Sequence, residues 1–166
     1  MNAGRALRKA VFTAHVVASV GWVGAVFAFL GVAVVALATG DAATARGAYL
    51  VMEPAAWFVL VPLAFASLVT GVVQALTTTW RLFHHYWVVS KLLINVVATV
   101  VLLAYMETFG SMADVAANPA SRLDMVQNAS PVAHAAGALV LLLAATLLAV
   151  FKPRGLTPYG RRKRRV

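Results

Sequence analysis

Residues 11–38 read VFTAHVVASVGWVGAVFAFLGVAVVALA and contain no Asp, Glu, Lys or Arg. A helix that crosses a membrane needs about 20 consecutive apolar residues, so this stretch is long enough to cross a bilayer with some tilt. It is also longer than the apolar region of a signal peptide, which is about 7–15 residues. The stretch therefore predicts a retained first membrane helix.

Three further apolar stretches follow the first, at residues 49–76, 87–106 and 131–151. The whole chain is 62% hydrophobic and 11% charged, whereas soluble domains are about 45–50% apolar and about 25% charged. Because the stretches are continuous instead of alternating, they favour helices over the strands of a membrane barrel. We expect an all-α integral membrane four-helix bundle at residues 1–151, followed by a basic tail at residues 152–166.

Basic and acidic residues are separated between the two sides of this bundle. With a cytoplasmic N-terminus, twelve of the 14 Lys and Arg residues fall on the inner side, and only Arg46 and Arg122 fall on the outer side. The positive-inside rule therefore predicts that both termini are cytoplasmic. The acidic residues all fall on the outer side: Asp41, Glu53, Glu107, Asp114 and Asp124.

The basic tail indicates a lipid partner. A basic cluster beside a membrane span attracts anionic lipid, and the tail lacks the interleaved aromatic residues that single-stranded nucleic-acid binders use. We expect the bilayer as partner, with anionic lipid at the tail, no nucleic acid, and assembly as a homo-oligomer or in a larger membrane complex. Aromatic residues typical of a headgroup belt occur in the second connection: Trp80, Phe83, Tyr86 and Trp87.

Small residues and prolines predict how the helices pack. Pro54 is expected in the first turn of the second helix, and Pro62 is expected to kink that helix. The long connection at 107–130 is expected to contain a short surface helix. Small residues expected at helix contacts are Gly21, Gly24, Ala28, Gly31 and Gly71.

Polar residues on the inner side form the first candidate site. Lys91, Asn95 and Thr99 recur every four residues and share one face of the third helix. Lys91 could reach the headgroups, whereas Asn95 is deeper and should bond to another helix. Haem is commonly held in bundle cores, so haem b is a candidate cofactor, with His15 as the preferred axial ligand. The candidate cofactor-binding residues are His15, Trp22, His84, His85, Lys91 and Asn95.

A second candidate site lies on the outer side. Thioethers and imidazole suit copper(I), and carboxylates suit harder ions, although methionine also fills space in cores and Glu53 could simply bond to His134. No nucleotide-binding loop or HExxH-type zinc motif occurs, and the absence of cysteine excludes thiolate sites. The candidate metal ligands are Met52, Glu53, Met106 and His134.

Residues 14–24, AHVVASVGWVG, and 87–93, WVVSKLL, carry a family resemblance. The first segment resembles the first helix of the copper-resistance D-type proteins and the J-type protoporphyrinogen oxidases, in which a tryptophan follows a histidine by seven residues. The second resembles the tryptophan-x3-lysine segment of the J-type oxidases. The resemblance implies a small four-helix bundle able to hold haem, with His15 and Lys91 as the residues carried over.

The tail, from Lys152 to Arg161, is similar to that of uncharacterised small actinobacterial membrane proteins. We therefore expect a multi-pass protein of the bacterial inner (cytoplasmic) membrane. The leading functional expectation is a haem-binding or redox-related membrane protein. The alternatives are a non-catalytic scaffold or accessory subunit, whose polar residues only set helix register, and a copper-handling or transport protein. Whether the protein is an enzyme stays open.

Overall fold

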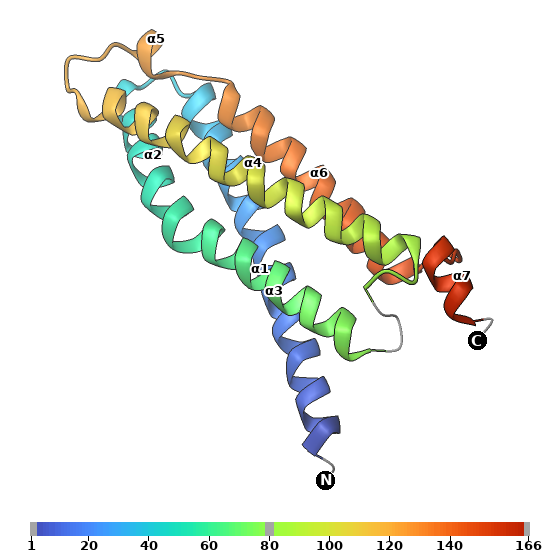
Figure 1. Ribbon diagram of the computed structural model, residues 1–166. Helices are drawn as coiled ribbons and strands as arrows, with labels where there is room; N and C mark the ends of the chain where they lie inside the picture. The colour runs from blue at the N-terminus through green and yellow to red at the C-terminus, as the bar shows by residue number, and fades with distance from the viewer. Residues whose placement is uncertain (1–2, 79–81, 165–166) are drawn as a thin grey trace.

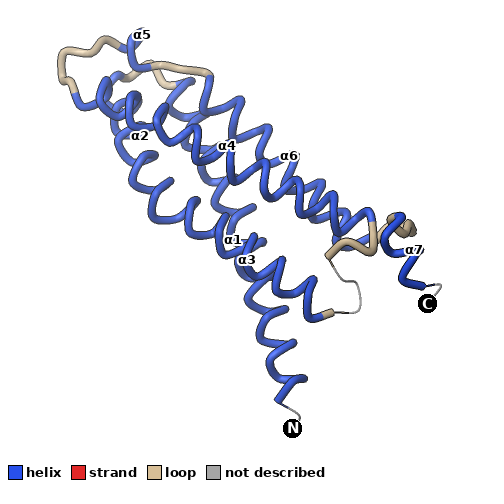
Figure 2. The backbone as a smooth tube through the Cα atoms, in the orientation of Figure 1, coloured by secondary structure: helices blue, strands red, loops and turns tan. Residues whose placement is uncertain are grey.

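The computed structural model describes residues 3–78 and 82–164 and is all-α. Four long helical spans lie side by side as a bundle (Figure 1), and the described residues form helices and loops without a strand (Figure 2). Trp80 and Arg81, expected at an interfacial connection, lie outside the described residues. The four-helix prediction is confirmed.

The first span is α1, Ala3–Ala38, and the second is a continuous run of α2, Ala42–Ala55, the π-helical η1, Ala56–Leu60, and α3, Val61–Thr77. The third is α4, Tyr86–Ala117, and the fourth is α6, Ser130–Phe151. Two short helices, α5 at Leu123–Val126 and α7 at Pro158–Arg164, complete the fold. Within residues 3–78 and 82–164, four helices are long and apolar enough to cross a membrane, so the chain is a multi-pass membrane protein.

Both termini lie at one end of the bundle, which we call the terminal end, and α5 lies at the other, the α5 end (Figure 1). At the α5 end, the second span begins seven residues before the predicted boundary because Asp41 caps it. The Asp41 carboxylate accepts the backbone N–H groups of Ala43 at 3.3 Å and Thr44 at 2.9 Å. The Thr44 hydroxyl also donates to it at 2.7 Å. These hydrogen bonds lower the pKa of Asp41, and the bond from the Thr44 hydroxyl has the largest effect.

The expectation that Pro54 sits in the first turn is wrong, because the helix already begins at Ala42. Pro54 lies near the end of α2, and η1 follows it. In η1 the Val61 N–H donates to the carbonyl of Ala56, five residues earlier, and Pro62, which has no N–H, comes next. The irregularity expected at Pro62 is therefore a π-helical turn just before it.

The apolar core is concentrated toward the α5 end. Phe109 of α4 packs edge-on against Phe29 of α1 and Tyr105 of α4, with ring centroids 5.9 Å and 4.9 Å away. Gly21 lies against Leu63, as predicted for a helix contact. Gly24 and Gly31, in contrast, face outward, and no atom lies within 4 Å of the position that a Cβ would take at either.

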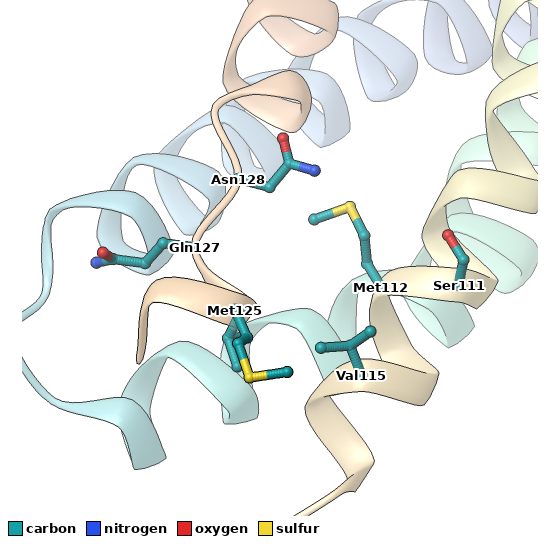
Figure 3. Close-up of a pocket in the computed structure, with 7 residues that line it drawn as sticks. Ser111, Met112, Val115, Met125, Gln127 and Asn128 are labelled. Atoms are coloured by element: carbon teal, nitrogen blue, oxygen red, sulfur yellow. The ribbon is translucent and has the colours of Figure 1, made fainter. Parts of the chain in front are cut away.

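The connection after α4 is fastened over the α5 end. Arg46 donates to the carbonyl of Ser121 at 3.1 Å, and the Gln127 amide donates to those of Leu37 at 2.9 Å and Thr39 at 2.8 Å. Beneath this connection lies a small pocket of about 230 Å³ (Figure 3). It is lined by Ser111, Met112, Val115, Met125, Val126, Gln127 and Asn128.

Candidate functional site

A cavity with a volume of about 520 Å³ lies among α1, α3, α4 and α6, toward the terminal end. This is within the range of about 300–1,000 Å³ that is usual for small-molecule sites. Most of its wall is apolar, including Phe12, Trp22, Leu92 and Leu142. Its polar lining residues include His15, Ser19, Ser67, Gln74, Lys91 and Asn95.

His15 is held between two other helices. The residue is 5% exposed, and Gly71 of α3 lies so close that a Cβ there would come 3.0 Å from the His15 Cε1 atom. Nδ1 lies 3.1 Å from the Thr70 hydroxyl oxygen, and Nε2 lies 3.0 Å from the Lys91 Nζ. An ammonium group on Lys91 can only donate, so the His15 Nε2 accepts from it. The ring proton is then on Nδ1, and the Nδ1–H donates to the Thr70 hydroxyl oxygen.

Lys91 faces the cavity, where its Nζ lies 3.0 Å from the His15 Nε2. The only ion pair among residues 3–78 and 82–164 joins Arg122 and Asp124, so Lys91 has no carboxylate partner there. A charged group inside a membrane is costly and is normally paired or functional. Lys91 is therefore a candidate functional residue of the cavity.

Asn95 joins a second polar chain across the bundle. Its Oδ1 accepts the Ser67 hydroxyl at 3.3 Å, and its Nδ2 donates to the Lys91 carbonyl at 2.9 Å. The hydroxyl oxygens of Ser67 and Ser19 lie 3.0 Å apart, which extends the chain to α1. The prediction that Asn95 bonds to another helix is confirmed. Thr99 completes the stripe by donating to the Asn95 carbonyl at 2.8 Å.

The residues that α3 supplies to this site were not predicted from the sequence. Ser67 and Thr70 bond to the predicted residues of α1 and α4, and Gly71 makes room for His15. A signal was available, because residues 67, 70, 71 and 74 recur at the spacing that places side chains on one helix face.

His84 and His85, expected at the depth of His15, are not among the residues that line the cavity. Both are half-buried in the connection before α4, and the His84 ring packs edge-on against Tyr159 with centroids 5.3 Å apart. Trp22, in contrast, is buried and lines the cavity. Of the four histidines, all of which the structure describes, His15 alone is buried and faces the cavity.

The candidate metal ligands lie at the α5 end, and their surroundings differ from one ligand to the next. His134 is exposed, stacks on Tyr105 at 4.0 Å between centroids, and bonds through Nδ1 to Ser130 instead of Glu53. Met52 and Met106 are buried in the apolar core. Within the described ranges, no three His, Asp or Glu side chains gather closely enough to hold a metal, and copper binding here stays a prediction.

Comparisons of the chain with protein-family models, with curated proteins and with solved structures found no match.

Proposed function

We propose that this membrane protein binds haem in the cavity among α1, α3, α4 and α6 and has a redox-related function, with His15 as the residue that would hold the haem iron. One observation carries the proposal: the single buried histidine lies on the wall of a mostly apolar cavity of about 520 Å³. When bound, haem would supply one-electron chemistry that side chains cannot.

The donor chemistry of His15 fits this role. A ligating histidine usually donates its other ring N–H to a partner that fixes the ring, and Thr70 is such a partner for Nδ1. Nε2 is held by Lys91, so ligation through Nε2 requires Lys91 to withdraw. Its flexible four-carbon stem allows that movement, and the ammonium would then suit a carboxylate of the bound group. Because His84 and His85 do not line the cavity, ligation by one histidine is proposed.

An absorption spectrum of the protein purified from haem-replete cells tests the proposal. We expect a Soret band and bound iron in the wild type, and their loss in His15→Ala. His134→Ala is the matched control, because it removes an exposed histidine that lies outside the cavity, and it should keep the band. A colourless wild-type protein would contradict the proposal, and loss of the band only in His134→Ala would move the site to the α5 end.

A non-catalytic scaffold or accessory subunit is the second candidate function. It is favoured by the way in which Ser19, Ser67 and Asn95 bond to one another inside the bundle. Such contacts can set helix register without any ligand. In this case the purified protein is colourless, and substitutions in the polar chain change stability alone.

We also propose the inner membrane of a bacterium as the location, with both termini cytoplasmic. The separation of charges supports this orientation: Arg5, Arg8 and Lys9 begin α1 at the terminal end, and basic residues follow α6 there, including those of α7. The exposed basic residues of α7 are proposed to contact anionic lipid. They are Arg161, Arg162 and Lys163.

A further inference from the structure

The chain after α6 folds back onto the connection that precedes α4. It leaves α6 through Lys152, which adopts a left-handed conformation with φ 44° and ψ 61°. Leu156 then forms an antiparallel bridge with His85, and the Tyr86 N–H donates to the Gly155 carbonyl at 3.3 Å. We call residues 152–164 the clasp and residues 83–86 its seat. Figure 1 shows the clasp helix, α7, beside the beginning of α4.

Thr157 fastens the clasp to its seat. This side chain is 8% exposed, its backbone N–H donates to the His84 carbonyl at 3.0 Å, and its hydroxyl donates to the Phe83 carbonyl. The same residue begins α7, because its hydroxyl oxygen accepts the Gly160 N–H at 3.1 Å and its carbonyl accepts the Arg161 N–H at 3.0 Å. One threonine therefore both starts the clasp helix and binds it to the seat.

Gly160 sets how closely α7 approaches the seat. A Cβ at this position would lie 2.5 Å from the carbonyl oxygen of His84, a separation that real Cβ atoms do not tolerate. The opposing atom is backbone, so it cannot turn aside as a flexible side chain could. Any side chain at 160 must therefore lift the clasp, which gives a specific way to release it.

The clasp and its seat border the cavity at the terminal end. The cavity is lined there by Leu82 and Trp87, which flank the seat, and by Lys152, the first residue of the clasp. By continuing from the end of α6 onto the beginning of α4, the seated clasp links two of the four helices that form the cavity walls.

We propose that the clasp is a latch that limits access to the cavity from the terminal end of the bundle. When it is seated, the ends of α6 and α4 are held together; when it is released, they can separate and admit a molecule. The latch controls entry alone, whichever ligand the cavity takes.

The chain has no cysteine, so a single introduced cysteine reports access without interference. Ala145→Cys places a thiol at a buried position on the cavity wall, in α6, and its rate of reaction with a polar maleimide is measured in the purified full-length protein. Adding Gly160→Val should raise this rate about tenfold, because labelling of a protected group follows local opening. Gly137→Val is the matched control, since its Cβ meets open space, and it should leave the rate unchanged.

Limited trypsin digestion after Arg161 and Arg162 measures release of the clasp independently of access. Gly160→Val should accelerate this cleavage, and Thr157→Val, which keeps the branched shape but removes the hydroxyl, should accelerate both cleavage and labelling to a smaller extent. If these variants release the clasp but Ala145→Cys labels at the original rate, the latch is overturned. Unchanged cleavage in both variants would overturn the seating on which it depends.

Discussion

At the scale of single residues, Asn95 shows how a polar side chain becomes tolerable inside a membrane protein. It is 7% exposed, and its amide both accepts from Ser67 on α3 and donates to the Lys91 carbonyl on its own helix. An amide without hydrogen-bond partners is costly in lipid. The position of Asn95 within α4 therefore predicts that its side chain faces protein. The partner, Ser67, however, belongs to α3, and the rotation of α3 about its axis cannot be predicted from the residues of α4.

Replacing Asn95 with leucine should destabilise the bundle by roughly 0.6–2 kcal/mol, the range for polar contacts between membrane helices. Both amide hydrogen bonds are lost, and the Ser67 hydroxyl must find another acceptor. Denaturation of the purified protein in detergent measures the change. Thr146→Leu is the control, because the Thr146 hydroxyl bonds only within α6, to the Leu142 carbonyl. Unchanged or increased stability in Asn95→Leu would show that the polar stripe does not contribute to packing.

At the scale of helices, the residues at which a helix begins and ends depend on capping side chains and on packing, which hydropathy does not detect. The apolar stretch beginning at Tyr49 marks the part of the second span suited to hydrocarbon, whereas the helix itself begins at Ala42 behind the Asp41 cap. Likewise, α4 continues to Ala117, well beyond the predicted residue 106, because Met112, Ala113 and Ala116 pack one face of this extension. Capping and packing, rather than apolar length, decide where these helices end.

Helix packing at the site predicts opposite effects for two glycine substitutions. Gly71→Ala should cost about 1–3 kcal/mol, typical of overpacking, because the new methyl group would press on a His15 ring held by Thr70 and Lys91. Gly31→Ala, whose Cβ meets open space, should instead stabilise α1 by up to about 1 kcal/mol through helix propensity. Detergent denaturation of both variants tests the difference, and equal effects would contradict the packing around His15.

At the scale of the whole molecule, charge and cavity are arranged along the same axis. The cavity lies toward the terminal end, which also carries the basic tail, and the acidic residues lie toward the α5 end. A ligand that enters from the terminal end therefore passes a positively charged surface before it reaches an apolar wall.

Reporter fusions test that orientation. A reporter joined after Val166 should be active in the cytoplasm, and reporters inserted between Asp114 and Asn128 should be active on the opposite side, because positively charged connections are retained inside. Activity of the C-terminal fusion on the outer side would reverse the assignment. It would also place the mouth of the cavity on the other face of the membrane.

Hydropathy along the chain is enough to predict the four membrane-length helices, because lipid requires long apolar segments whose backbone hydrogen bonds are satisfied internally. The sequence also places Lys91, Asn95 and Thr99 on one face, since helical periodicity is a local property. Contacts between helices could not be predicted in this way. Lys91 contacts His15, and Ser67 and Thr70 complete the site. The His84 carbonyl accepts a hydrogen bond from the clasp, and His84 does not line the cavity. The physical reason is that tilt and rotation of a membrane helix are set by packing against its neighbours, which no single helix encodes.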